Sequence, residues 1–317
     1  MELPGWSWLA KVICGFGNRE QVHGLATKCS SPQDCKVTTF SDDKDRTRRF
    51  GFKPEKRLGQ HFLVDKNALK LLLAAAELGP EDVVIEVGPG LGILTKELAK
   101  RAAQVIAVEI DARLVSTLRR KLSFFGNIEI IHGDILKIPP QQLLRSVPVS
   151  SWRYKVVANL PYYITSPALR HFLEAQVKPS LMVTMVQKEV GEAIATTGKM
   201  SLLSLRVQFY SKPAIVAYVP AKSFYPTPEV DSLILRLDVY PKPIIEVSDV
   251  AGFFDIISCG FSSPRKQLRN SLAQALGIPP SQVALLLEKV GIEARRRAET
   301  LSLGEWEKLW RVSAPFL

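Results

Sequence analysis

The chain of 317 residues is 46% hydrophobic and 23% charged, an ordinary balance for a globular protein with room for one large domain and a smaller one. Its formal net charge of +11 is unusual for a metabolic enzyme and favours a polyanionic partner, either nucleic acid or an anionic membrane surface. No apolar run approaches the roughly 20 residues of a membrane span, so nucleic acid is the better prediction. The four cysteines have no C-x-x-C spacing and no histidine pair completes a zinc site, which predicts a reducing compartment and no bound metal.

Residues 1–50 show no periodic pattern and end in a charge-dense segment, which is typical of a flexible extension. Several acidic residues argue against an organelle-targeting leader, because such leaders contain few acids, but a leader and an over-long start-codon assignment both stay open. We therefore expect a cytoplasmic protein, with an organellar location as the alternative if this extension is a transit peptide.

Strand-like and helix-like patterns alternate from residue 65 onward. The expected strands are residues 83–87, 105–109, 128–132, the run from 156 to the stop at Asn159-Leu160-Pro161-Tyr162, and 181–186. Capping residues mark three helix N-termini, at Asp65, at Asp111 and at Thr165-Ser166-Pro167, where proline would take the first helical position. This alternation predicts an α/β fold with a doubly wound, mostly parallel sheet.

Two further strand-like runs, at residues 214–219 and 232–237, flank a proline-rich loop and predict an antiparallel edge to this sheet. From about residue 247 the pattern becomes helical, with proline and glycine breaks. We therefore expect a sheet domain over residues 51–243 and a small helical domain over residues 244–317.

A glycine-rich turn, Gly88-x-Gly90-x-Gly92, follows the first strand of the sheet. Such a turn lets Gly88 and Gly90 approach a ligand closely, and Glu109 at the end of the next strand can accept both hydroxyls of a ribose. An NAD enzyme and an S-adenosylmethionine enzyme share these two features. The G-x-G-x-G spacing and the carboxylate of Glu86 just before it favour S-adenosylmethionine, although a tight turn without a ligand remains the alternative.

The strand that begins at Val156 ends abruptly at Asn159, because proline cannot continue a ladder of hydrogen bonds. An amide side chain, backbone carbonyls and the aromatic face of Tyr162 converge at that end. An amide oxygen and a carbonyl can accept two hydrogen bonds from an exocyclic amine, while a tyrosine ring can stack on a base. The pattern favours a site for an adenine or cytosine amino group, and a plain strand–loop–helix connection is the alternative.

Asp134 follows the third strand and could accept a hydrogen bond from the adenine amine of a cofactor. It could equally cap the next segment. Its position in series with Glu109 and Asn159, each at the carboxyl end of a strand, favours the ligand-binding interpretation.

Prolines stiffen the loop over residues 224–232 and would hold Phe224 in place with little loss of entropy. We expect Phe224 to contact the substrate base, opposite or beside Tyr162; a buried phenylalanine in a proline-rich connection is the alternative. Basic clusters elsewhere would contact phosphates independently of sequence, although such runs are often solvated faces. The predicted RNA-binding residues are Lys53, Lys56, Arg57, Arg265, Lys266 and Arg269, with a further cluster at Arg295-Arg296-Arg297.

Eight segments, taken together, resemble the ribosomal small-subunit adenine dimethyltransferases, the kasugamycin-sensitivity family. They lie in family order over residues 55–312. The segments are Leu58-Gly59-Gln60-His61-Phe62-Leu63, Glu86-Val-Gly-Pro-Gly-Leu-Gly92, Val108-Glu109-Ile-Asp111, Gly133-Asp134, Asn159-Leu-Pro-Tyr162, Gln187-Lys-Glu-Val190, Phe224-x-Pro-x-Pro-x-Val-x-Ser232 and Arg265-Lys-x-x-Arg-Asn-Ser-Leu272.

The resemblance implies a Rossmann-like class I methyltransferase that uses S-adenosylmethionine and carries a helical RNA-binding domain at its C-terminal end. It implies transfer of two methyl groups to N6 of each of two adjacent adenosines, in the 3′-terminal hairpin loop of small-subunit rRNA, by a monomer acting on an immature ribosomal small subunit. By this match the cofactor site would be lined by Gln60, His61, Leu63, Gly88, Glu109, Asp134 and Asn159, and the target base would face Asn159, Leu160 and Tyr162.

Two other functions stay open at this point. Within the same fold, a 23S rRNA adenine methyltransferase that confers macrolide resistance is the nearest rival, but the Arg265–Leu272 segment and the form Asn-Leu-Pro-Tyr favour the small-subunit enzyme. A non-catalytic RNA-binding factor, such as an assembly checkpoint or a mitochondrial transcription factor, is a different class. The intact set of Glu109, Asp134 and Asn159 argues against it.

Overall fold

The computed structural model describes residues 54–55, 58–148 and 153–313, and the statements below concern these residues. The extension expected over residues 1–50 lies outside them. Within the described part the central sheet consists of β2 (Val83–Val87), β3 (Gln104–Glu109), β4 (Ile128–His132), β5 (Tyr154–Asn159), β6 (Leu181–Gln187), β7 (Ser211–Val219) and β9 (Ser232–Val239).

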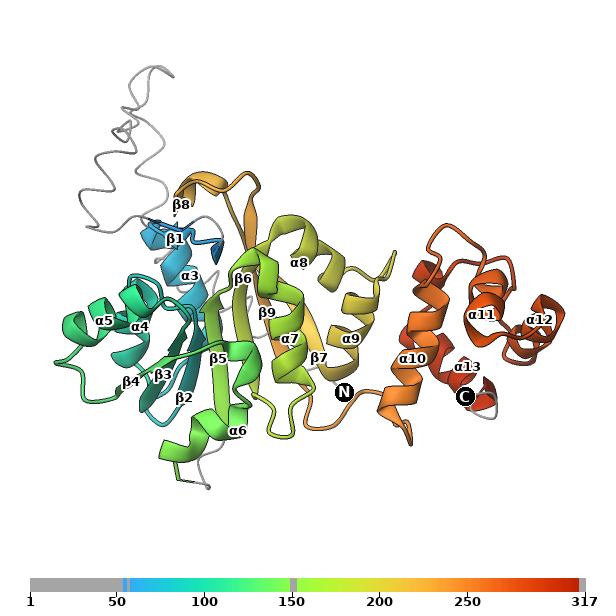
Figure 1. The fold of residues 1–317 in the computed structure, drawn as a ribbon, viewed down its shortest axis with the longest axis horizontal. Coiled ribbons are helices and arrows are strands. Elements are labelled where there is room, and N and C mark those ends of the chain that lie inside the picture. The colour runs from blue at the N-terminus through green and yellow to red at the C-terminus, as the bar shows by residue number, and fades with distance from the viewer. Residues whose placement is uncertain (1–53, 56–57, 149–152, 314–317) are drawn as a thin grey trace, which may run out of the picture. The chain divides into compact units, whose positions relative to one another are not determined.

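The strands are ordered β4-β3-β2-β5-β6-β9-β7 across the sheet (Figure 1). The strands from β4 to β6 run parallel, whereas β9 is antiparallel to both β6 and β7. The order confirms the doubly wound, mostly parallel sheet and the antiparallel edge that the sequence predicts. It also brings the carboxyl ends of the parallel strands to one edge, where ligands bind in such sheets.

A second, two-stranded pairing joins segments that are far apart in the chain. β1 (Phe62–Leu63) pairs with β8 (Phe224–Tyr225) in antiparallel fashion, with Phe62 opposite Tyr225 and Leu63 opposite Phe224. Two residues are too few to show periodicity, so the sequence did not indicate either strand. The pairing places the segment before the first helix beside the proline-rich loop.

Helices connect the strands and then form the C-terminal part of the chain. In the sheet region they are α3 (Lys66–Ala76), α4 (Ile93–Ala99), α5 (Ala112–Lys121), α6 (Pro140–Leu143), α7 (Thr165–Leu173), α8 (Lys188–Ala195) and α9 (Leu202–Tyr210), with 3₁₀ turns at Ile135–Lys137 and Tyr162–Ile164 among others. The C-terminal helices are α10 (Val250–Phe261), α11 (Leu268–Leu276), α12 (Pro280–Lys289) and α13 (Leu303–Ser313).

Alternate strand residues enter two separate cores, one on each face of the sheet. On one face Val84 and Val157 pack with residues of α3 and α4. On the other face Ile85 and Val156 join a larger cluster that includes α7 and continues into the C-terminal helices. Because both faces are covered, these strands read as continuous apolar runs, which is the pattern that predicted parallel strands.

Helix starts were predicted with mixed success. Asp65 and Asp111 cap α3 and α5 through their side chains, as expected. The predicted cap at Ser166, with Pro167 as the first helical residue, is wrong: the 3₁₀ turn at Tyr162–Ile164 leads directly into α7, which begins at Thr165. Proline fits there because the first four N–H groups of a helix have no partner within it.

The sequence did not indicate the helices α6, α8 and α9. α9 buries residues around its circumference, including Leu205, Val207 and Phe209, so it lacks the polar face on which periodicity depends. Its start does carry a signal, because Ser201 and Ser204 exchange side-chain to backbone hydrogen bonds in a capping box. The third helical residue of a capping box is usually Glu or Gln; here it is Ser204, so the sequence does not show the usual motif.

The C-terminal helices group together in Figure 1, and α10 packs on α9. The ring centroid of Phe209 lies 5.6 Å from that of Phe253 and 5.2 Å from that of Phe254 in α10. One apolar cluster therefore extends across the boundary expected at residues 243 and 244. The division into two domains at that position stays a prediction.

Gly92 supplies a stability test of the glycine-rich turn. Its φ is +78°, and an added Cβ would lie 2.7 Å from Cδ2 of Leu118 in α5. Gly92→Ala combines backbone strain with a clash, so we expect the free energy of unfolding to fall by about 1–3 kcal/mol in urea denaturation. Gly126→Ala is the control, because nothing lies within 4 Å of its Cβ position. Equal losses in the two variants would contradict the steric argument.

Candidate active site

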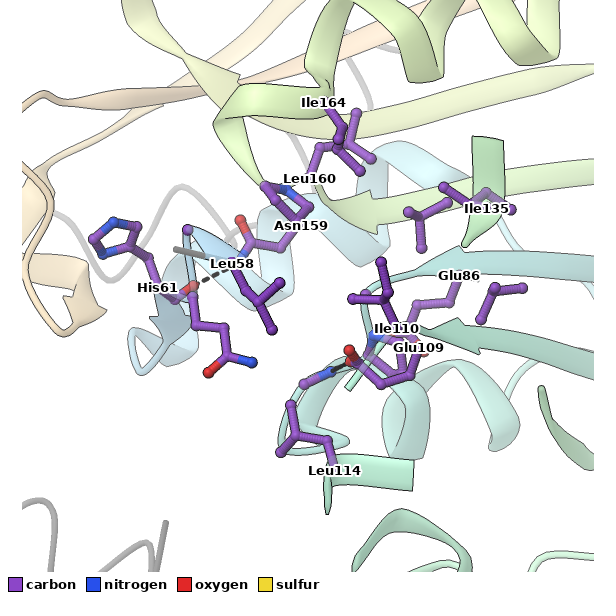
Figure 2. Close-up of a pocket in the computed structure, with 18 of the residues that line it drawn as sticks. Leu58, His61, Glu86, Glu109, Ile110, Leu114, Ile135, Asn159, Leu160 and Ile164 are labelled. Atoms are coloured by element: carbon purple, nitrogen blue, oxygen red, sulfur yellow. Dashed lines mark hydrogen bonds between the residues drawn. The ribbon is translucent and has the colours of Figure 1, made fainter. Parts of the chain in front are cut away.

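A cavity of about 200 Å³ lies at the carboxyl edge of the parallel strands (Figure 2). Residues at the ends of four strands and in the segment before α3 line this cavity. Its lining comes from residues 58–63, 86–91, 93–94, 108–110, 114, 133–136 and 159–164.

Glu109 ends β3 inside this cavity and is 4% exposed. Its Oε2 accepts the N–H of Gly90 at 3.1 Å, and its Oε1 accepts the N–H of Asp111 at 3.0 Å. These bonds hold the carboxylate still, while each oxygen keeps a lone pair for a further donor. Burial raises the pKa of Glu109, and the backbone N–H groups offset part of that increase.

Glu86 in β2 is a second buried carboxylate of the cavity and is 1% exposed. Burial raises the pKa of Glu86 to about 8, and the nearby charge of Glu109 adds to the increase. Its Oε2 has no hydrogen-bond partner within the described part of the chain. Buried polar atoms nearly always have a partner, so this oxygen is available to a donor on a ligand.

The glycine-rich turn closes against the segment before α3. Gly90 has a φ of +57°, and a Cβ there would lie 3.0 Å from two ring atoms of Phe62. A larger residue would displace Phe62, which pairs with Tyr225 in the two-stranded sheet. Glycine at this position therefore keeps the turn both close to Phe62 and bonded to Glu109.

Asn159 ends β5 and lines the cavity on the side opposite Glu109 (Figure 2). Its Nδ2 donates to the backbone carbonyl of His61 at 2.9 Å. Because a carbonyl can only accept, this bond requires the amide nitrogen to face His61 and turns Oδ1 away from it. No donor among the described residues bonds to Oδ1, which leaves an acceptor for a ligand.

His61 and Tyr162 form a pair of rings beside Asn159. Their centroids are 5.7 Å apart with an interplanar angle of 22°. His61 Nδ1 donates to the carbonyl of Pro226 at 2.7 Å, and the Tyr162 hydroxyl shares a hydrogen bond of 2.7 Å with Ser232 Oγ. Both rings are thus held by the segment that contains the proline-rich loop.

Gln60 ties the segment before α3 to the start of α5. Its Oε1 accepts the N–H of Glu55 at 2.8 Å, and its Nε2 donates to Asp111 Oδ2 at 3.0 Å. Arg113 also pairs with Asp111 at 2.7 Å, and this contact lowers the pKa of Asp111 to about 2. The loop that carries Gln60 is therefore fixed next to Glu109.

Most of the predicted site residues come together around this cavity. Those that line it are Gln60, His61, Leu63, Gly88, Gly90, Glu109, Asp134, Asn159, Leu160 and Tyr162. Asp134 also accepts the N–H of Leu136, so it caps the next turn as well as facing the cavity. Ile110 and Tyr163 also line the cavity but were not predicted, although each directly follows a predicted site residue in the chain. The roles of all these residues stay predictions.

Phe224 does not line the cavity. It is fully buried in β8, opposite Leu63, within the core that lies on the α3 side of the sheet. Contact with a base would require the strand pairing of β1 and β8 to open. The structure therefore agrees with the alternative of a buried phenylalanine in a proline-rich connection.

Two of the three basic clusters lie side by side. Arg265 and Lys266 are exposed and Arg269 is half-buried around the start of α11. The N–H of Leu268 donates to the carbonyl of Arg296 at 2.7 Å, which brings this cluster next to Arg295-Arg296-Arg297. The third predicted cluster, Lys53, Lys56 and Arg57, lies outside the described residues.

Within residues 54–55, 58–148 and 153–313, no helix is long and apolar enough to span a bilayer. In the same ranges no group of three or more His, Cys, Asp or Glu side chains could hold a metal ion.

Comparisons with known proteins identify the family. The family model for ribosomal RNA adenine dimethylase matches residues 51–313. A protein of Dehalococcoides mccartyi named ribosomal RNA small subunit methyltransferase A is 51% identical over 268 residues, covering 84% of this chain and 90% of its own length. A protein of the same name from Moorella thermoacetica is 43% identical over 271 residues, covering 83% of this chain and 94% of its own.

Two solved structures have a similar fold. The crystal structure of the 23S rRNA methyltransferase ErmE is 30% identical, with a TM-score of 0.63, and covers 79% of this chain and 98% of its own. A dimethyladenosine transferase from Plasmodium falciparum, 24% identical, has the same fold with a TM-score of 0.68 and covers 81% and 98%. The fold is that of the Rossmann-like class I methyltransferases. The chain belongs to the ribosomal RNA adenine dimethylase family and is a methyltransferase.

The buried carboxyl group of Glu86 predicts a pH dependence of stability. Its pKa is about 8 in the folded protein and has the ordinary value of 4.5 in the unfolded chain, so between these values only the folded state keeps the proton. Stability should therefore fall as pH rises from 4.5 to about 8, by a few kcal/mol in total. Glu86→Gln should flatten this slope in urea denaturation from pH 5 to 8 without added ligand.

The exposed residue Glu246 provides the control for that experiment. Glu246→Gln should keep the wild-type slope of stability against pH. A Glu86→Gln variant with an unchanged slope would show that Glu86 ionises normally.

Proposed function

We propose that this protein transfers methyl groups from S-adenosylmethionine to the N6 amino groups of two adjacent adenosines in the 3′-terminal hairpin loop of small-subunit rRNA. The observation that carries the proposal is the orientation of Asn159, whose nitrogen is bonded to His61 and whose oxygen remains for an exocyclic amine. The names of the relatives from Dehalococcoides and Moorella support small-subunit RNA as the substrate.

The cavity fits S-adenosylmethionine, which when bound supplies an electrophilic methyl group. Glu109 would accept the ribose hydroxyls, and Asp134 the adenine amine. The unpartnered Oε2 of Glu86 would accept from an ammonium group, such as that of the amino-acid arm, whose positive charge would favour the ionised carboxylate. The remaining contacts of this proposed cofactor site are Gln60, His61, Leu63, Gly88, Gly90 and Asn159.

The target amine would be held by Asn159 Oδ1 and the carbonyl of Leu160, with Tyr162 stacked on the base. Accepting both N–H bonds turns the lone pair of N6, otherwise delocalised into the ring, toward the methyl group. As the new N–C bond formed, the methyl–sulfur bond of the donor would break and leave S-adenosylhomocysteine, and the amine proton, now acidic, would pass to solvent, so no strong base is needed. These residues would thus act by positioning and by dipoles directed at developing positive charge.

The reaction makes two further demands on the site. The base must leave its stack, which costs less in a hairpin loop than in a duplex. In the second transfer to the same N6 only one N–H remains, so one of the two acceptors, Asn159 Oδ1 or the Leu160 carbonyl, becomes dispensable.

Methylation of large-subunit rRNA is the second candidate. It is favoured by the similarity to ErmE, a 23S rRNA methyltransferase at 30% identity. The small-subunit relatives at 51% and 43% identity favour the first candidate, as does the segment Arg265–Leu272. We therefore place small-subunit rRNA first.

Basic residues would hold the RNA through its phosphates. We propose that residues 244–317 form the RNA-binding part, with Arg265, Lys266 and Arg269 on phosphates, joined by Lys53, Lys56 and Arg57. The substrate particle would be an immature small subunit, and the protein would act as a monomer in the cytoplasm. Mass spectrometry of the native N-terminus would distinguish this location from an organelle, because a transit peptide within residues 1–50 would be removed.

Substrate choice is tested with a labelled methyl donor, immature small subunits and large subunits in separate incubations. We expect label only in small-subunit rRNA, recovered as N6,N6-dimethyladenosine. Label in 23S rRNA would support the second candidate, and no label with the folded protein would contradict both.

Asn159→Ala should lower the methylation rate by about 100-fold or more, because an acceptor for the amine is lost. Binding of small subunits should change by less than about threefold, since the phosphate contacts remain. Asn67→Ala, at an exposed position in α3, is the control and should keep wild-type activity. Loss of particle binding together with activity in Asn159→Ala would contradict the assigned role.

Glu109→Gln tests the cofactor site without any turnover. Hydrogen bonds to a charged acceptor are stronger than neutral ones, so the affinity for S-adenosylhomocysteine should fall by about 10- to 100-fold in calorimetry. Glu246→Gln should bind as the wild type does. Unchanged affinity in Glu109→Gln would place the ribose elsewhere.

A further inference from the structure

The segment from Phe224 to Ser232 is fixed to the body of the protein at both ends. At its start, β8 pairs with β1, and the carbonyl of Ser223 accepts the N–H of Val64 at 2.9 Å. At its end, Ser232 opens β9 and pairs with Gln187 of β6 on one side and Val219 of β7 on the other. Both attachments involve backbone ladders, so the segment is a rigid support.

Two groups of this segment reach the candidate active site. The carbonyl of Pro226 accepts a hydrogen bond from His61 Nδ1, and Ser232 Oγ is bonded to the Tyr162 hydroxyl, each at 2.7 Å. Neither Pro226 nor Ser232 lines the cavity. They act on it only through His61 and Tyr162.

Those two rings connect the segment to the predicted amine acceptor. The ring of His61 stacks on that of Tyr162, and the carbonyl of His61 holds the amide of Asn159 at 2.9 Å. A continuous series of contacts thus runs from Ser232 through Tyr162 and His61 to Asn159.

Ser232 is the member of this series with the least freedom. It is 0% exposed and lies between two strands, whereas Tyr162 lies on a short 3₁₀ turn and is half-buried. Without the bond, the Tyr162 ring would lose a restraint on its χ1 and χ2 angles. A hydroxyl on a strand between two others therefore helps to set the direction of an aromatic ring on a short 3₁₀ turn.

We propose that Ser232 is a positioning residue for the methyl acceptor: through the Tyr162 hydroxyl it sets the ring face on which the target adenine stacks. The inference rests on the proposed function and assigns a role to the end of the Phe224–Ser232 segment. It also gives the buried Phe224 a part, as the anchor of that segment and not as a contact to the base.

The test compares Ser232→Ala with Tyr162→Phe, because each removes the same hydrogen bond and keeps the aromatic ring. Loss of one such bond should lower kcat on small subunits by about three- to tenfold. The KM for the particle should change by less than twofold, since basic residues on the phosphates would hold it, and S-adenosylhomocysteine should bind as before. The double variant should be no worse than the poorer single variant.

Ser211→Ala is the matched control. Ser211 is equally buried, begins β7 and loses a hydrogen bond of 2.8 Å to the carbonyl of Val207, away from the cavity. It should keep the wild-type kcat even if it lowers the melting temperature. A similar drop in kcat for Ser211→Ala and Ser232→Ala would show that the Ser232 variant acts through lower stability of the fold, and this would overturn the proposal.

A readout without turnover is the ¹⁹F spectrum of protein labelled with 3-fluorotyrosine. The Tyr162 signal is assigned by its absence in Tyr162→Phe; it should shift in Ser232→Ala and stay in place in Ser211→Ala. Additive losses in the double variant, or an unmoved signal, would overturn the proposal. If the wild type does not methylate small-subunit rRNA, the proposed function fails, whereas an active wild type with an equally active Ser232→Ala refutes this inference alone.

Discussion

An amide side chain has a donor end and an acceptor end, and in this protein one hydrogen bond decides which end faces the cavity. Asn159 Nδ2 donates to the carbonyl of His61, a residue 98 positions earlier in the chain. β5 brings Asn159 to the edge of the sheet, and the pairing of β1 with β8 holds the segment that carries His61. The acceptor at the end of β5 therefore depends on a long-range pairing of two very short strands, and the rest of the site is arranged around it.

The remaining polar groups follow from the topology of the sheet. Three of the parallel strands each contribute one group at the carboxyl end: Glu109 ends β3, Asp134 follows β4 and Asn159 ends β5. Apolar cores on both faces keep these strand ends in register. Because Glu86 and Glu109 are buried close together, the cavity has acceptors with few protein donors, which suits a ligand rich in hydroxyl and amino groups.

The sequence predicted these strand ends well because buried parallel strands are continuous β-branched runs; β2 and β4 have the bounds that the pattern indicated. It could not predict what depends on contacts between distant segments. The pairing of Leu63 with Phe224 buries the phenylalanine that was expected beside the base, and the bond from Ser232 to Tyr162 spans 70 positions. Local patterns carry no information on such contacts. The 3₁₀ turn that leads directly into α7 was also missed, because its three residues are too few to show a periodic pattern.

The aromatic contact between α9 and α10 has a consequence for the size of the smallest working protein. Phe209 packs against Phe253 and Phe254, and the guanidinium of Arg206 lies 4.3 Å from the centre of the Phe254 ring. A chain truncated before α10 would expose this aromatic surface to water and invite aggregation. Because one apolar cluster joins α9 to α10, a soluble protein without the C-terminal helices would need polar replacements on the exposed face of α9.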